Sequence, residues 1–286
     1  MDLDIVVLAA GKGTRMVSEK PKVLHMLGEK PLLSHVLSTA LELNPRNLLV
    51  VLGHQAELIK KELPSEVEVV LQHEQLGTGH AVKESIKKLD DKGMLLVLFG
   101  DVPLLRVLTL AQILDVANEK TLAFLSAQFL EPGKLGRVVR NQNGNVIKIV
   151  EDADASIAEK EIREINSGVM AIPKCSLVNW LDKLKGSNNQ GELYLTDLVE
   201  IALSESFNVE AIVCDEPEEV IGINTPWDLA QAERIYQKRK AKELALMGVR
   251  IADPERLDIR GNIEVGKDYY LDVNVILEGH VILGDR

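Results

Sequence analysis

The chain has 286 residues, of which 46% are apolar and 27% charged, a composition that excludes a disordered protein. Its formal net charge of −11 argues against nucleic acid or an anionic membrane as a partner, and aromatic residues, at 3%, offer little for stacking on bases. No apolar run reaches membrane-spanning length, and the acidic start lacks the basic region of a signal peptide. We therefore expect a cytoplasmic protein, with Cys175 and Cys214 as buried free thiols.

The first predicted element is a buried strand that ends in a turn with two glycines. The apolar run from Ile5 to Ala10 is typical of a parallel strand. The turn should expose backbone N–H groups beside a helix N-terminus, an arrangement that suits phosphate oxygens, and Lys12, Arg15 and Lys22 would add positive charge. The common dinucleotide and P-loop motifs are not met, and a plain turn with solvated basic residues is the alternative.

Strands and helices alternate after this turn. The sequence predicts a helix over 31–43, a strand over 47–53, a helix over 55–63, and strands over 67–71 and 94–99 with a helix over 82–89 between them. This alternation indicates parallel βαβ units and an α/β fold, with a Rossmann-like sheet covered by helices on both faces. Ligands of such sheets bind at the carboxyl ends of the strands.

Polar side chains lie at the ends of two predicted strands and of a short run over 221–223 that could be a further strand. The amide of Gln72 could read the imide edge of uracil. Asp101 follows the strand over 94–99, and because triphosphate chemistry needs a hard cation with oxygen ligands, it is the leading magnesium ligand. Asn224 offers a neutral oxygen at a later strand end. Each of these residues could instead cap a turn or a helix.

The rest of the chain changes character twice. Short strands from 121 to 150 include Asn143-Gly144, a strong hairpin signal, and strands over 164–172 and 209–213 follow. After a long helix over 228–247, five six-residue units begin at 257, as in hexapeptide β-helices. We predict an α/β domain over 1–227, a linker helix over 228–250 and a short start of a β-helix over 251–286.

Four strings resemble sugar-nucleotide pyrophosphorylases. They are A-A-G-x-G-T-R-M with a following P-K, then Q-x-E-Q-L-G-T-G-H-A, G-D-x-P-L and E-I-N-S-G. The second and fourth resemble a narrower family, the N-acetylglucosamine-1-phosphate uridyltransferases. Phe99 and Leu135 depart from tyrosines that this family often has at these positions.

The resemblance implies a role for each matching residue. Nucleotide contacts would come from Leu8, Ala9, Ala10, Gly11, Gly13, Gln72, Gly77, Thr78, Phe99 and Gly100. Sugar contacts would come from Gly136, Glu151, Asn166 and Asn224. Arg15, Lys22 and Asp101 would be the catalytic residues, and Asp101 and Asn224 would hold Mg²⁺.

The implied reaction joins UTP and N-acetylglucosamine 1-phosphate into UDP-N-acetylglucosamine and pyrophosphate. The resemblance also implies that residues 1–227 form a nucleotidyltransferase (pyrophosphorylase) domain and that residues 251–286 begin a left-handed β-helix. In full-length relatives this β-helix transfers an acetyl group from acetyl-CoA and forms a trimer. This chain stops before that second active site, so we expect no acetyl transfer and leave homo-oligomerisation open. The alternatives are a pyrophosphorylase for another base or sugar, and a non-catalytic subunit that binds nucleotide sugars.

Overall fold

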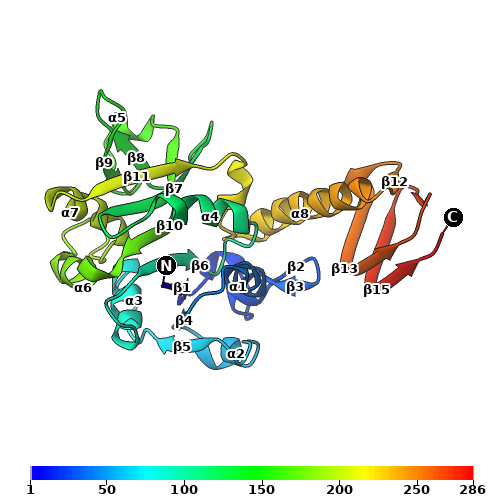
Figure 1. Ribbon diagram of the computed structural model, residues 1–286, viewed down its shortest axis with the longest axis horizontal. Coiled ribbons are helices and arrows are strands. Elements are labelled where there is room, and N and C mark those ends of the chain that lie inside the picture. Colours follow the sequence, from blue (N-terminus) through cyan, green and yellow to red (C-terminus); the bar gives the residue numbers. More distant parts are fainter. Residues whose placement is uncertain (1, 286) are drawn as a thin grey trace.

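The computed structural model describes residues 2–285, which form a large α/β unit, a long helix and a small unit of β-strands (Figure 1). The strands are β1 (Leu3–Ala9), β2 (Met26–Leu27), β3 (Lys30–Pro31), β4 (Asn47–Leu52), β5 (Glu68–Leu71), β6 (Met94–Phe99), β7 (Thr121–Gln128), β8 (Arg137–Arg140), β9 (Val146–Val150), β10 (Glu164–Pro173), β11 (Asn208–Val213), β12 (Arg250–Ile251), β13 (Leu257–Val265), β14 (Tyr270–Leu271) and β15 (Val275–Leu283). The α-helices are α1 (Leu32–Glu42), α2 (Ala56–Lys60), α3 (Thr78–Ser85), α4 (Val107–Val116), α5 (Ile157–Lys160), α6 (Lys174–Lys183), α7 (Leu198–Ser204) and α8 (Pro226–Leu246). Short 3₁₀ turns cover Thr14–Met16, Lys22–Leu24, Ile86–Lys88, Leu195–Asp197, Pro217–Val220 and Pro254–Arg256.

The main sheet has the strand order β11-β7-β10-β6-β1-β4-β5, with β8 and β9 attached to β10. Strands β6, β1, β4 and β5 are parallel, as the sequence predicts. Strand β10, however, runs antiparallel to both of its neighbours, β6 and β7, so the sheet is mixed. The beginning of β10 therefore lies at the same sheet edge as the carboxyl ends of β1 and β6.

Helices cover both faces of this sheet, which confirms the predicted α/β architecture. Successive residues of β1 point to opposite faces, and both faces are buried, because every residue of the strand is apolar apart from Asp4. One core includes side chains of α1, α2 and α4, and the other includes side chains of α3, α6 and α7. This packing fixes the strand ends that carry the candidate site.

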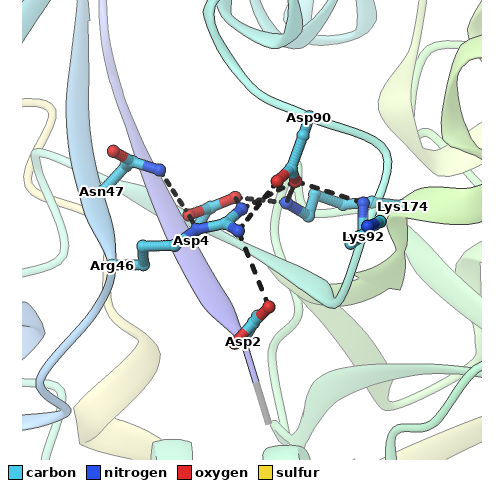
Figure 2. Close-up of polar contacts among 7 residues, drawn as sticks. All are labelled: Asp2, Asp4, Arg46, Asn47, Asp90, Lys92 and Lys174. Atoms are coloured by element: carbon cyan, nitrogen blue, oxygen red, sulfur yellow. Dashed lines mark hydrogen bonds and ion pairs between the residues drawn. The ribbon is translucent and has the colours of Figure 1, made fainter.

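A cluster of charged side chains lies at the opposite edge, where β1 begins (Figure 2). Asp4 is fully buried and pairs with the buried Lys174 and with Arg46, and both cations also bind Asp90. Asn47 donates a hydrogen bond of 2.8 Å to Asp4. Burial alone would raise the pKa of Asp4, but these hydrogen bonds outweigh it and hold the pKa below its ordinary value.

The C-terminal strands have the register of a hexapeptide β-helix. Leu257 in β13 pairs in parallel with Val275 in β15, three six-residue units later, and three such units make one coil. The last turns of α8 pack against this unit through Ala241 and Leu244. The amide of Gln237 in α8 binds both the N–H and the carbonyl of Ile259, at 2.6 and 3.0 Å.

Helix α8 also belongs to the large unit. Its first half packs through Leu229, Ala232 and Ile235 against Leu27 and Leu32. In Figure 1 it runs from the sheet to the C-terminal strands at the far end of the molecule. The predicted boundaries at 227 and 250 remain predictions, but α8 makes apolar contacts with both units and does not stand free as a spacer.

Two local predictions are wrong. No α-helix follows the glycine turn directly; a 3₁₀ turn over Thr14–Met16 does, and the next α-helix begins at Leu32. Cys214 is buried as expected, whereas Cys175, near the start of α6, is exposed.

The hairpin at Asn143-Gly144 is confirmed, with the Gly144 N–H bonded to the carbonyl of Asn141 at 2.9 Å. Within residues 2–285, no helix combines the length and the apolar character needed to cross a bilayer.

Candidate active site

Two cations and two oxygen-bearing side chains meet at the carboxyl edge of the sheet. The Lys22 ammonium pairs with the Asp101 carboxylate and donates a hydrogen bond of 3.1 Å to Oδ1 of Asn224. Arg15 donates a second hydrogen bond, of 2.9 Å, to the same Asn224 oxygen. The sequence separations are large, so this meeting is a product of the fold.

Local structure explains why these side chains are available. Asp101 follows β6, as predicted, whereas the prediction of a strand before Asn224 is wrong, because residues 221–224 belong to no strand. The carbonyl of Asp101 accepts a 2.9 Å hydrogen bond from the N–H of Ile223, which brings Asn224 beside it. Thr225, rather than Asn224, caps α8: its hydroxyl accepts from Asp228 N–H, and the Asp228 carboxylate accepts from the N–H of Thr225. The Asn224 side chain is therefore left to face the cations.

The glycine turn lies against Lys22. A Cβ atom on Gly13 would stand 2.6 Å from Cβ of Lys22, so only glycine permits this close packing. Within residues 2–285, no backbone hydrogen bond uses the N–H groups of Gly11 and Lys12, so both can donate to a ligand. Lys12 and Arg15 are exposed, whereas Lys22 is largely covered.

A cavity of about 230 Å³ opens beside this cluster. Its lining includes Leu8, Ala9, Ala10, Gly11, Lys22, Gln72, Gly77, Thr78, Phe99 and Asp101, all predicted site residues. The Gln72 amide nitrogen donates to the carbonyl of Gly77 at 3.1 Å and lies 3.0 Å from Nδ1 of His80. Among the described residues, the amide oxygen of Gln72 has no such partner and remains available to a ligand.

A second cavity, of about 220 Å³, holds the predicted sugar contacts Gly136, Glu151 and Asn166. Asn166 comes from the start of β10, so the antiparallel direction of that strand brings it to this edge. Its backbone N–H donates to the carbonyl of Gly136 at 2.9 Å. A Cβ on Gly136 would stand 3.2 Å from Oε2 of Glu151, which places the carboxylate directly over this glycine.

The two cavities share Thr78 and Phe99. The Phe99 ring is held by Gly168 in β10, which has a φ of +86° and no room for a side chain, because an added Cβ would overlap the ring. A ligand in one cavity therefore lies directly beside a ligand in the other.

Burial raises the pKa of Glu151 above its ordinary value, and the nearby carboxylates of Asp197, Asp154 and Glu192 add to this effect. A hydrogen bond of 3.0 Å from the Thr196 hydroxyl opposes it. The sugar-side cavity thus contains a carboxylate whose ionisation depends on its immediate neighbours.

Most of the predicted site residues line these cavities or belong to the cation cluster. Gly13 and Gly100 lie just behind: Gly13 packs on Lys22, and Gly100 packs on Ala9 and Val23. The structure adds Gln75 and Glu192 to the first cavity and Lys134 and Thr196 to the second. Glu192 and Thr196 stand in the string G-E-L-Y-L-T-D over 191–197, for which the sequence analysis assigned no residue roles.

The cluster suits a divalent cation. Oδ2 of Asp101 and Oδ1 of Asn224 both contact the Lys22 ammonium, so both oxygens converge on one positive charge. Carboxylate and amide oxygens are the hard donors that magnesium prefers. Within residues 2–285, no group of three or more His, Cys, Asp or Glu side chains could hold a metal. A cation here would therefore take its remaining ligands from water and substrate, which is common for magnesium.

Comparisons with known proteins find a matching family model and similar proteins. A family model described as "MobA-like NTP transferase domain" matches residues 5–147. The chain is similar to the bifunctional protein GlmU of Neisseria meningitidis strain FAM18, with 45% identity over 284 residues, 99% of this chain and 62% of that protein. It is similar to the GlmU proteins of Nitrosococcus oceani and Chromohalobacter salexigens, with 45% and 46% identity over 286 residues and 63% of each protein. The chain thus spans less than two thirds of these relatives.

Proposed function

Because the chain belongs to the family of MobA-like NTP transferase domains, we propose that it transfers UMP from UTP to N-acetyl-α-D-glucosamine 1-phosphate. The products are UDP-N-acetylglucosamine and pyrophosphate. The similarity to GlmU proteins along nearly the whole chain supports this choice within the family.

The observation that carries the proposal is the junction of the two cavities. The first cavity lies beside the cation cluster and the glycine turn, and the second contains Glu151 and Asn166, whose polar groups suit a sugar. Thr78 and Phe99 line both cavities, and Asp101 lines the first. A triphosphate in one and a sugar phosphate in the other would meet next to Asp101 and Lys22.

The reaction needs little proton transfer from the protein. A phosphate monoester loses its second proton near pH 6, so the attacking oxygen of the sugar phosphate is already ionised at neutral pH. It attacks the α-phosphorus in line, the bond to the bridging oxygen of pyrophosphate breaks, and pyrophosphate leaves. Catalysis is therefore positioning and charge stabilisation, which Arg15, Lys22 and the free N–H groups of the turn supply.

Asp101 and Asn224 would hold Mg²⁺. When bound, the metal neutralises charge on the reacting phosphates. On the nucleotide side, the Gln72 amide oxygen can accept the uracil N–H. On the sugar side, Glu151 accepts sugar hydroxyls and Asn166 binds the acetamido group.

A substrate panel tests the proposal. Pyrophosphate release is measured with four nucleoside triphosphates and with several sugar phosphates, each with and without Mg²⁺. We expect release with UTP and N-acetylglucosamine 1-phosphate in the presence of Mg²⁺, and release at least tenfold slower with the other pairs. Faster release with another base or another sugar would refute the assigned substrates.

The same panel separates the two alternatives. A non-catalytic subunit would bind UDP-N-acetylglucosamine and release no pyrophosphate with any pair, but the convergence of Asp101, Asn224 and Lys22 favours an enzyme. Adding acetyl-CoA and glucosamine 1-phosphate tests the prediction that acetyl transfer is absent. The proposal includes a cytoplasmic location, and it leaves homo-oligomerisation to be measured in solution.

A further inference from the structure

The segment from Glu192 to Thr196 connects the two cavities through hydrogen bonds. The Leu193 N–H donates to the carbonyl of Leu76, and the Gly79 N–H donates to the carbonyl of Leu193, both at 2.8 Å. The Leu195 N–H donates to the hydroxyl of Thr78 at 3.0 Å. Residues 193–195 are therefore joined to the turn that lines the nucleotide-side cavity.

The next residue, Thr196, reaches the sugar-side cavity. Its hydroxyl donates to Oε1 of Glu151 at 3.0 Å, and the residue is 94% buried, since 6% of its surface is exposed. Both residues line the cavity that contains Asn166. A hydroxyl has one proton, so donating it to Oε1 fixes the orientation of both side chains.

We propose that Thr196 is a positioning residue that holds the Glu151 carboxylate so that its second oxygen, Oε2, accepts a hydroxyl of the sugar. This inference rests on the proposed function, because it takes the second cavity as the sugar site. Oε2 stands over Gly136, where a side chain at position 136 would come within 3.2 Å of it. Thr196 itself need not touch the sugar.

The charges around Glu151 make such a partner important. Asp154, Asp197 and Glu192 face it and, with burial, favour its neutral form. Further charged groups line the cavities that Glu151 also lines, namely Lys134, Lys148, Asp152, Lys185 and Glu200. Because the Thr196 hydroxyl donates to the ionised carboxylate, it favours the ionised form of Glu151, in which both oxygens accept hydrogen bonds.

The experiment compares Thr196→Val, which replaces the hydroxyl with a methyl group, with Thr196→Ser, which keeps the hydroxyl. Thr109→Val is the matched control, because Thr109 donates a 2.7 Å hydrogen bond to the buried Glu219, and neither residue lines the two cavities. We expect Thr196→Val to raise KM for the sugar phosphate roughly 10- to 100-fold, as for a lost hydrogen bond to a charged group, with KM for UTP changed less. Thr196→Ser, which keeps the hydroxyl, should have a KM for the sugar phosphate close to that of the parent.

A titration gives a readout that does not need turnover. The Glu151 carboxyl is followed by ¹³C NMR in glutamate-labelled protein and assigned with Glu151→Gln. Its pKa should rise in Thr196→Val, return toward the parent value in Thr196→Ser and stay unchanged in Thr109→Val. In an active enzyme, the acid limb of kcat/KM for the sugar phosphate should shift to higher pH in step.

The outcomes separate the inference from the proposed function. An unchanged Glu151 titration in Thr196→Val overturns the inference, even if the parent makes UDP-N-acetylglucosamine. An active Thr196→Val variant whose KM for the sugar phosphate matches that of Thr109→Val also overturns the inference. A parent that consumes no sugar phosphate refutes the proposed function, and the titration then decides whether Thr196 controls the carboxylate. If Thr196→Val does not fold, Thr196→Ala replaces it in both measurements.

Discussion

The Lys22 ammonium pairs with the Asp101 carboxylate, although 79 positions of sequence separate the two residues. Lys22 follows the glycine turn after β1, and Asp101 follows β6, which pairs with β1 in the sheet. The pair thus joins the proposed phosphate-binding turn to the proposed metal site. Both side chains are mostly covered, with exposed fractions of 13% and 18%.

Replacing Asp101 by Ala should remove the charged metal ligand. We expect pyrophosphate release to fall about 10²- to 10³-fold, the range for losing one group that stabilises transition-state charge. The melting temperature should change little, because Asp101 is partly exposed and not part of the apolar core. Asp115→Ala, at an exposed position in α4, is the control and should keep full activity. Near-normal turnover of Asp101→Ala at saturating Mg²⁺ would refute the ligand assignment.

Lys22→Met tests the ammonium group apart from the packing of its side chain. The methionine chain can still pack on Gly13, whereas the positive charge is lost. We expect kcat/KM for UTP to fall about 100-fold with an almost unchanged melting temperature. Lys240→Met, which removes a partly exposed i,i+3 partner of Glu243, serves for comparison. Equal kcat/KM in the Lys22 variant and the parent would exclude Lys22 from the site.

Gly168→Ala should disturb both cavities at once. An added methyl group would overlap the Phe99 ring, and the positive φ adds backbone strain of roughly 1 kcal/mol. Gly144→Ala has a similar φ of +82° but meets no atom within 4 Å, so it isolates the strain. We expect Gly168→Ala to cost more stability in urea than Gly144→Ala and to raise KM for both substrates. Indistinguishable variants would show that Phe99 is not held in this way.

Lys174→Met tests the buried charge cluster. Removing this cation leaves the Asp4 carboxylate buried with one partner fewer, and we expect the free energy of unfolding to drop by about 3 kcal/mol. Lys183→Met, on the same helix, breaks a partly exposed pair with Glu205 and should cost less than about 1 kcal/mol. Urea denaturation at pH 7 measures both. Equal losses would contradict a special role for burial.

The pH dependence of this cluster has a definite sign. The folded-state pKa of Asp4 is lowered, so its contribution to stability is complete above the unfolded-state pKa of about 3.9 and is lost as the pH falls through the folded-state value. The difference in unfolding free energy between the parent and Lys174→Met should therefore be constant from pH 7 to about pH 5 and shrink below about pH 4. A difference in unfolding free energy that grows on acidification would contradict a lowered folded-state pKa for Asp4.

Strands whose position depends on the local apolar pattern could be predicted from the sequence. β6 lies where its apolar run stands, and β1 and β4 agree to within two residues, because strands buried on both faces are apolar throughout. Helix α3 begins at Thr78 rather than Val82, since Gly77-Thr78 pack against Leu193, a contact that local sequence does not reveal. The direction of β10 is likewise set by its neighbours and not by its composition.

The candidate site likewise contains residues that could be identified from the sequence and residues that could not. Asp101 and Gln72 could be found because they follow strands whose ends share an edge. Glu192 and Thr196 could not be given roles, because they lie in an irregular segment whose position depends on hydrogen bonds to residues 76–79. Helices α4 and α6 also went unpredicted, although both pack on the sheet.

The antiparallel course of β10 makes this strand sensitive to length. Side chains alternate between faces along a strand, so inserting or deleting one residue before Asn166 would turn its amide away from the pocket and expose core residues in its place. The exposed hairpin tip at 141–145 has no such constraint. Engineers who wish to graft a tag or a sensor into this protein should place it in that tip and leave the spacing of β10 intact.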